Sequence, residues 1–251
     1  MTNEKLKLNE ILKLDRYRNI SLVGAGGKTT LIKRLTFTLK KTKMILISST
    51  TSFTEPDVTK YDFIDYFYDH DYDFKEITKP GIYIIGTTKK QENLILGLSV
   101  EVIEKIAADF DYSIIECDFA NGRPLKGFRD FEPVIPKTTD MTLGIIDIHS
   151  LGLLVHASNI HHLDKFIELT GSTIGAMVTI PNLKEIIDNK DALFSNAVGK
   201  KVLFINKVEK VLDQALAASL LEAIDKSKLN LIIEGSLQDE TYHIVYENHY
   251  Y

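Results

Sequence analysis

The sequence lacks the features that mark secreted, membrane and nucleic-acid-binding proteins. Only one of its 251 residues is a cysteine, Cys117, which excludes an internal disulfide framework and favours a reducing compartment. The formal net charge is −5 and no basic stripe is present, so we expect no DNA or RNA partner. No apolar run approaches the about 20 residues that span a bilayer, and residues 1–14 alternate charge with leucine. We therefore expect a cytoplasmic protein with no signal peptide and no membrane partner.

Short runs rich in β-branched residues alternate with amphipathic segments along the chain. Continuous apolar runs of this kind are typical of strands buried on both faces of a parallel sheet, and we expect them at 19–24, 43–49, 81–86, 112–118, 142–148, 175–180, 201–207 and 229–235. Apolar residues at helical spacing predict helices at 29–41, 100–109, 161–170 and 211–227. This alternation predicts one α/β domain over residues 1–251, a doubly wound, mostly parallel sheet with helices on both faces, in a three-layer arrangement like that of P-loop NTPases.

A glycine-rich loop lies where the first expected strand turns into a helix. Glycines there can adopt positive φ and direct backbone N–H groups towards an anion, and the helix dipole adds to the attraction. Lys28 would reach the β- and γ-phosphates of a nucleotide, and Thr29 would offer its hydroxyl to Mg²⁺. The spacing Gly-x-x-Gly-Lys-Thr-Thr is shorter than the common phosphate loop and occurs in Mur-type ligases. The predicted phosphate loop comprises Gly24, Ala25, Gly26, Gly27, Lys28, Thr29 and Thr30.

Acidic and hydroxyl side chains at two other strand ends are candidates for the metal that accompanies a nucleotide. Glu116 and Asp118 end the expected strand at 112–118 and share one face, so either would approach Mg²⁺ or orient a water. Cys117 points the other way and is expected to be a buried packing residue. Thr50 and Thr51 end the strand at 43–49, and Thr51 is a further candidate metal ligand. Alternatively, these strand-end hydroxyls hydrogen-bond only to the backbone and bind no metal.

The segment "LFINKVE" resembles the base-recognition element of GTP-binding proteins. In that element an asparagine braces the phosphate loop, a lysine stem packs on the purine, and a carboxylate accepts hydrogen bonds from guanine. Asn206, Lys207 and Glu209 occupy these positions here. Because Glu209 is one methylene longer than the usual aspartate, the sequence leaves ATP and GTP both open as ligands.

Two further groups of residues have several interpretations. The loop at 120–136 carries Arg123 and Lys126, which would neutralise transition-state charge or hold an anionic substrate, or are solvated surface charges. Four of the seven histidines lie together in sequence, at His149, His156, His161 and His162. Their spacing does not match ligand pairs on one helix, so lining a cleft or packing is favoured over a metal site.

Five segments together resemble the YqeC family. They are "VGAGGKTTL", "STTSF", "ECDFANGRPLKGFRDFEPVIP", "VHASNIHHLDKFIELTGS" and "LFINKVE", and the resemblance covers roughly residues 15–240. The family often has Glu-Ala-Asp-Gly where this chain has Glu116-Cys117-Asp118-Phe119, and Thr-Thr-Thr-His where this chain has Ser49-Thr50-Thr51-Ser52. The resemblance implies a nucleotide-binding accessory protein of selenium-dependent molybdenum hydroxylases, which helps to mature or deliver their cofactor. A molybdenum hydroxylase or its cofactor is then the expected partner.

Three activities fit this pattern of residues. The first is an Mg²⁺-dependent NTPase, with Lys28, Glu116, Asp118, Arg123 and Lys126 as the catalytic candidates. The second is an ATP-dependent kinase or ligase that acts on a small anionic molecule held by the 123–129 loop. The third is a nucleotide-binding switch or scaffold that hydrolyses poorly and docks a partner enzyme. All three require a nucleoside triphosphate, ATP or GTP, with Mg²⁺.

Overall fold

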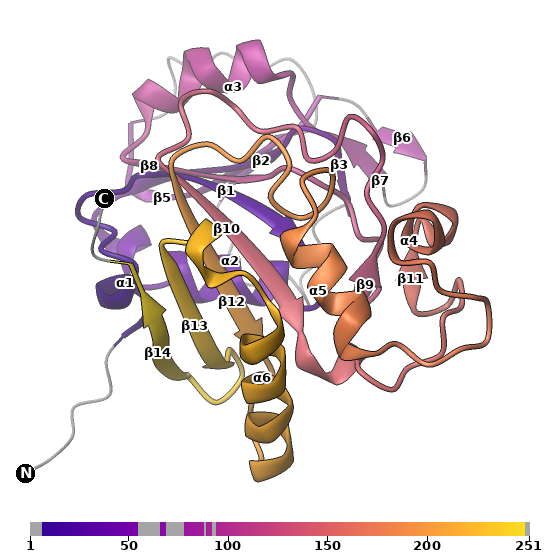
Figure 1. The fold of residues 1–251 in the computed structure, drawn as a ribbon. Helices are drawn as coiled ribbons and strands as arrows, with labels where there is room; N and C mark the ends of the chain where they lie inside the picture. Colours follow the sequence, from indigo (N-terminus) through magenta and orange to yellow (C-terminus); the bar gives the residue numbers. More distant parts are fainter. Residues whose placement is uncertain (1–6, 55–65, 69–77, 88, 92–93, 249–251) are drawn as a thin grey trace, which may run out of the picture.

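The computed structural model describes residues 7–54, 66–68, 78–87, 89–91 and 94–248. Its centre is a nine-stranded sheet in the order β14-β13-β12-β10-β1-β8-β2-β5-β4 (Figure 1). All neighbours in it are parallel except β13 and β14, which are antiparallel. The strands are β1 (Asn19–Gly24), β2 (Met44–Ser49), β4 (Tyr66–Tyr68), β5 (Gly81–Ile85), β8 (Tyr112–Glu116), β10 (Met141–Asp147), β12 (Lys200–Asn206), β13 (Leu231–Ser236) and β14 (Thr241–Glu247). The expected α/β fold with a mostly parallel sheet is confirmed.

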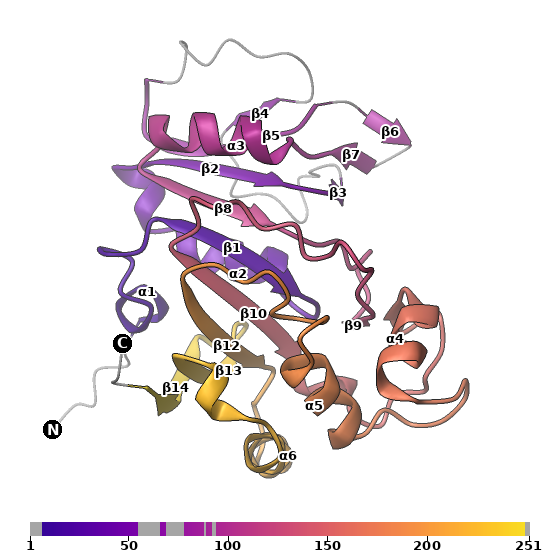
Figure 2. The same cartoon turned by 45° about the horizontal axis from the view of Figure 1, so that its top comes forward.

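Helices pack on both faces of this sheet. In Figure 2, α2 lies behind the sheet and α5 lies in front of it. Side chains alternate along each central strand, so Leu22 of β1 joins one apolar cluster and Val23 joins the other. The helices are α1 (Leu8–Ile11), α2 (Lys28–Thr36), α3 (Val100–Ile106), α4 (Leu163–Thr170), α5 (Ile180–Asp188) and α6 (Val211–Ala223), with 3₁₀ turns at Leu39–Lys41, Ala107–Asp109, Ile148–Ser150 and Lys226–Lys228.

Two small sheets flank the carboxyl ends of the main strands. β3 (Ser52–Thr54), β7 (Leu94–Leu96) and β6 (Lys89–Gln91) form an antiparallel sheet just beyond β2. β9 (Leu125–Lys126) and β11 (Ile160–His161) pair in parallel. Gly127 follows β9, and a Cβ there would lie 2.3 Å from the backbone nitrogen of Phe166. Only glycine therefore allows the 120–136 loop to pack so closely on α4.

One expected strand is wrong. Residues 175–180 form no strand of a sheet, and Met177 makes only an isolated bridge with Leu154. Helix α5 begins instead at Ile180, where Thr179 and Asn182 form a capping box and a proline occupies the first turn. The apolar run was too short to distinguish a strand from the approach to a buried helix. Strand β14 and helix α5 were not predicted.

Candidate functional site

The loop between β1 and α2 folds tightly because its glycines have almost no space around them. Gly24, Gly26 and Gly27 have φ values of 98°, 85° and 144°. A Cβ at Gly26 would lie 2.3 Å from the Cβ of Asp147, and one at Gly27 would lie 2.5 Å from the side-chain nitrogen of Asn206. The loop is therefore held between β1 and the ends of β10 and β12, and side chains at these positions would displace it.

Asp118 anchors this loop from the β8 side. Its carboxylate is fully buried and accepts a hydrogen bond of 2.8 Å from the Gly24 N–H. The Lys28 ammonium contacts both this carboxylate and the Asp118 carbonyl, and lies 3.6 Å from Glu116. Burial alone would raise the pKa of Asp118, but Lys126, Lys28 and the Gly24 N–H hold it below its usual value. Asp118 is therefore an ionised structural anchor.

The remaining groups around Lys28 respond to burial in different ways. Burial would lower the pKa of Lys28, but the charges of Asp118 and Glu116 raise it above its usual value, so Lys28 stays charged. Burial raises the pKa of Glu116, and Lys28 offsets only part of that effect. Burial also raises the pKa of the Cys117 thiol to about 12, in keeping with the packing role expected for it. Glu116 is thus the carboxylate whose charge depends most on what Lys28 contacts.

The buried ion network continues away from the loop through Lys126. This side chain is 1% exposed, and its ammonium lies 2.9 Å from Glu132, 3.4 Å from Asp118 and 4.8 Å from the Phe128 ring centre. Glu132 is itself buried and lies 3.9 Å from His162. The 120–136 loop is therefore tied to the glycine loop through charges that water does not reach.

Asn206 braces the glycine loop from its other side. Its amide nitrogen donates to the Gly26 carbonyl at 2.8 Å, and its amide oxygen accepts from the Leu237 N–H at 3.2 Å. The next residue, Lys207, has a φ of 66°, a left-handed conformation that costs a residue with a Cβ roughly 1–2 kcal/mol. This turn places the Lys207 ammonium 2.5 Å from the carboxylate of Asp147.

Glu209 lies further along the same turn and is exposed. One carboxylate oxygen accepts a 3.0 Å hydrogen bond from the Ser236 hydroxyl, at the end of β13. The backbone N–H of Glu209 is held by Asp213 at 3.1 Å, in the first turn of α6. One carboxylate oxygen of Glu209 therefore already accepts a hydrogen bond from the end of β13.

A cavity of about 900 Å³ opens over the amino end of α2 and is lined by residues from six parts of the chain. Helix α2 contributes Lys33 and Arg34, and the loop after β8 contributes Phe119 and Pro124. The end of β13 and the turn after it contribute Ser236, Leu237 and Gln238. Eleven of the residues expected to form the site line this cavity: Ala25, Gly26, Gly27, Lys28, Thr29, Thr30, Glu116, Arg123, Asn206, Lys207 and Glu209.

Other expected site residues lie outside the lining of this cavity. Gly24 and Asp118 lie beneath the loop, where the Gly24 N–H donates a hydrogen bond to the Asp118 carboxylate. Lys126 is buried against Glu132, because a low dielectric favours close pairing of opposite charges. Thr51 lies in a turn after β2, where its hydroxyl is 3.2 Å from the Ser49 hydroxyl. The Thr50 hydroxyl donates to the Val134 carbonyl, the backbone role that was the alternative for these threonines.

The four histidines have separate partners. His149 lies 3.1 Å from Asp213, and His156 lies 2.9 Å from the Ser158 hydroxyl. Burial, with His162 and nearby cations, lowers the pKa of His161 to about 3, so its neutral ring accepts from the Arg123 guanidinium at 3.2 Å. Within the described part of the chain, no three His, Cys, Asp or Glu side chains are grouped to hold a metal.

Asp147 lines the same cavity over α2, although it was not among the expected site residues. It is 1% exposed, lies against Gly26, binds Lys207, and accepts the His149 N–H at 2.9 Å. Its signal was present, because "TLGIID" places a carboxylate at the end of an apolar run, as "YSIIE" does for Glu116. What was missing was the knowledge that β10 is the direct neighbour of β1.

The comparison with known protein families matches the part of the chain that carries the glycine loop and the 120–136 loop. The family model described as YqeC protein matches residues 20–164, which is more than half of the chain. The chain belongs to the YqeC family. A protein of Escherichia coli (strain K12), described as uncharacterized protein YqeC, is 27% identical over 226 residues, which is 88% of each chain. No solved structure matches.

The part that the YqeC family model matches holds most of the cavity wall. It contains the glycine loop, Glu116, Arg123 and Asp147, together with the buried pair Lys126 and Glu132. Asn206 and Glu209 lie beyond it. No helix among the described residues is long and apolar enough to cross a membrane.

We predict that Lys126→Met lowers the free energy of unfolding by about 3–5 kcal/mol, because it leaves Glu132 buried without its cation. Urea denaturation measures this. Adding Glu132→Leu should recover part of the loss, since an apolar pair replaces a broken ion pair. The control is Lys165→Met, whose partners Asp130 and Glu168 are 89% and 70% exposed, and which should leave the urea midpoint nearly unchanged. Equal losses of unfolding free energy in Lys126→Met and Lys165→Met would contradict a stabilising role of the buried ion network.

Proposed function

We propose that this protein binds a nucleoside triphosphate with Mg²⁺ over the glycine loop and hydrolyses it, as a P-loop NTPase-like protein. The observation that carries the proposal is the cavity of about 900 Å³ at the amino end of α2. It brings together the glycine loop, Glu116, and the Asn206–Glu209 turn, from the ends of β1, β8 and β12. Ligands of open α/β sheets bind outside the carboxyl ends of the strands, which is where this cavity lies.

The donors in the cavity match the chemistry of a triphosphate. Among the described residues no side chain caps the amino end of α2, so the N–H groups of its first turn are free to bind an anion. Thr29 and Thr30 line the same wall and supply hydroxyls. Lys33 and Arg34, one turn further along α2, also line the cavity, and the Arg34 guanidinium is held there by Glu240 and by the Leu237 carbonyl. Bound nucleotide would supply the phosphoryl group, with Mg²⁺ bridging its oxygens.

Lys28 has to exchange partners for this to happen. In the structure its ammonium is held by Asp118 and Glu116. A triphosphate offers more negative charge than these two carboxylates, so we propose that Lys28 turns from them to the β- and γ-phosphates. Glu116 then loses its cation. Because it lines the cavity, its carboxylate would accept a hydrogen bond from a water bound to Mg²⁺. Asp118 keeps Lys126 and the Gly24 N–H and stays in place.

Transfer to an acceptor is the second candidate function. The same cavity extends past the glycine loop to Asn121, Arg123 and Pro124, which leaves room beyond a triphosphate. The Arg123 guanidinium is held by the Ala157 carbonyl at 2.6 Å and by His161, so it is a fixed positive charge on that wall. Phosphate release that rises only when a carboxylate-bearing acceptor is added would favour transfer over hydrolysis.

As the role of this activity we propose maturation or insertion of a selenium-containing molybdenum cofactor, with a molybdenum hydroxylase as the partner. This part of the proposal rests on the family resemblance, whereas nucleotide binding rests on the geometry of the cavity.

We predict that Lys28→Ala abolishes triphosphate binding in isothermal calorimetry. The reason is that the loop loses the one cation it carries towards the β- and γ-phosphates. Lys41→Ala, an exposed lysine in the 3₁₀ turn after α2, is the matched control and should bind as the wild type does. Circular dichroism shows that both variants are folded at the temperature used. Unchanged affinity in Lys28→Ala would exclude the phosphate-loop function.

We predict different defects in Glu116→Gln and Asp118→Asn. Glu116→Gln should remove most of the Mg²⁺ dependence of phosphate release and leave nucleotide binding in EDTA largely intact, because Glu116 faces the cavity. Asp118→Asn should mainly lower the free energy of unfolding, since it leaves Lys28 and Lys126 less compensated in the interior. Normal Mg²⁺ dependence in Glu116→Gln would place the metal elsewhere.

We predict a purine pocket that accepts both ATP and GTP. One oxygen of Glu209 is already bonded to Ser236, so the carboxylate is only partly available to guanine. Competition binding should give affinities for GTP and ATP within about 30-fold of each other, and Glu209→Ala should change both alike. A larger preference for GTP that collapses in Glu209→Ala would contradict this, because a lost charged hydrogen bond is worth roughly 10- to 150-fold in affinity.

A further inference from the structure

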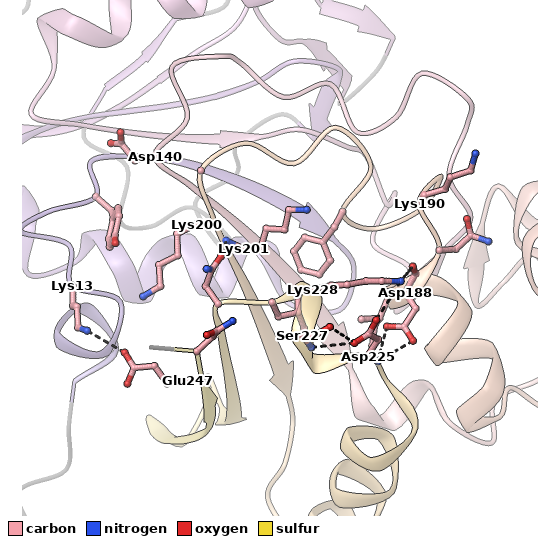
Figure 3. A pocket seen from close by; sticks show the side chains of 18 of the residues that line it. Lys13, Asp140, Asp188, Lys190, Lys200, Lys201, Asp225, Ser227, Lys228 and Glu247 are labelled. Carbon is pink, nitrogen blue, oxygen red and sulfur yellow. Dashed lines mark hydrogen bonds and ion pairs between the residues drawn. The ribbon is translucent and has the colours of Figure 1, made fainter. Parts of the chain in front are cut away.

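A second large cavity lies at the opposite end of the same strands. It has a volume of about 1040 Å³ and is lined by residues around the amino ends of β10, β12 and β13 (Figure 3). Strand β12 begins in this cavity, at Lys200, and ends in the other, at Asn206. The amino edge of a parallel sheet is not where ligands of such folds usually bind, so this cavity is distinct from the proposed nucleotide site.

The acidic side chains of this cavity are all engaged by the protein itself. Asp140 accepts hydrogen bonds of 2.9 and 2.8 Å from the N–H groups of residues 18 and 19. Asp188 lies 2.7 Å from the Lys184 ammonium, and Glu247 lies 3.1 Å from that of Lys13. Asp225 accepts from the Ser227 hydroxyl at 2.6 Å. These carboxylates stabilise turns and helix ends and are already compensated.

Three of the basic side chains are not compensated in this way. Among the described residues, Arg16, Lys200 and Lys201 form no salt bridge with a carboxylate. The Lys200 ammonium lies 5.3 Å from the centre of the Tyr17 ring. Burial and the charge of Lys13 lower its pKa, and the carboxylate of Glu247 offsets only part of that effect. Six basic and four acidic side chains line the cavity, although the whole chain carries a net charge of −5. The cavity therefore concentrates positive charge that the rest of the protein lacks.

The shape of the lining limits what would fit between these charges. Lys200 and Lys201 are consecutive at the start of β12, so they project to opposite faces of the sheet edge. Figure 3 shows their side chains diverging across the cavity. Tyr17 and Phe194 add two partly buried rings to the lining, and Leu229 adds an aliphatic surface. A ligand that meets both lysines must carry at least two separated negative groups.

We propose that this cavity binds a small organic polyanion, whose phosphate or carboxylate groups are held by Arg16, Lys200 and Lys201 and whose flat body lies against Tyr17 and Phe194. The site is independent of the glycine loop, and its existence does not require the proposed nucleotide chemistry.

The experiment uses inorganic tripolyphosphate, citrate and inorganic phosphate as probes of the full chain, by calorimetry and by amide shifts in ¹H–¹⁵N spectra. Tripolyphosphate or citrate should bind at least about 10-fold more tightly than phosphate, because each has separated charges. The amides of Gly199, Lys201 and Asn230 should shift. Tripolyphosphate bound at the glycine loop would instead shift the amide signals of residues 24–29. Lys28→Ala would remove only the binding at that loop.

Three double variants decide the site. Lys200→Ala with Lys201→Ala should weaken the better probe at least about 10-fold, whereas the two arginine replacements should retain most of the affinity. Lys41→Ala with Lys105→Ala removes the same charge from exposed positions elsewhere and should have no effect. Undiminished binding in the double alanine variant overturns the proposal, as does binding of every probe only above about 10 mM, a range of ordinary weak association. A preference for tripolyphosphate or for citrate identifies the anionic group.

Discussion

The geometry of the glycine loop depends on one buried carboxylate. Asp118 bonds to the Gly24 N–H at the end of β1, to Lys28 at the start of α2, and to Lys126 in the 120–136 loop. An isolated charge at this depth would cost several kcal/mol, so the three partners are a condition for burying it at all. Because each partner belongs to a different segment, the same carboxylate sets the position of a strand end, a helix start and a distant loop.

The opposite side of the glycine loop is held by the buried amide of Asn206 and by the ion pair of Lys207 with the buried Asp147. Asn206 joins Gly26 to the Leu237 N–H, and Lys207 joins the end of β12 to Asp147 at the end of β10. The loop is thus fixed from β8 on one side and from β10 and β12 on the other. Its Gly24 N–H is bonded to Asp118 and its Ala25 N–H to the Ile145 carbonyl, while Ala25, Gly26 and Gly27 line the cavity between the two sides.

The two cavities differ in how their charges are balanced. At the carboxyl ends of the strands, Lys28 is paired with acids that a ligand has to replace. At the amino ends, Arg16, Lys200 and Lys201 carry charge that no described carboxylate pairs with. The strands β10 and β12 run from one cavity to the other, so the two ends of the same strands carry cavities with different charge balance.

The amino-acid sequence by itself determined the local features. Continuous apolar runs placed seven of the strands of the main sheet, because a strand buried on both faces has no polar alternative. The glycine loop before α2 and the acids at 116 and 118 were visible as residues that follow such runs. Only the tertiary structure decided which side chains meet. Glu116 and Asp118 share a strand face in sequence terms, yet Glu116 lines the cavity while Asp118 is sealed beneath the loop by Gly24 and Lys126. Asp147 became part of the site only because β10 is the neighbour of β1, and the short apolar run at 175–180 formed no strand but leads into α5. Strand order and the partners of buried charges depend on contacts between residues far apart in the chain, and a local pattern carries no information about them.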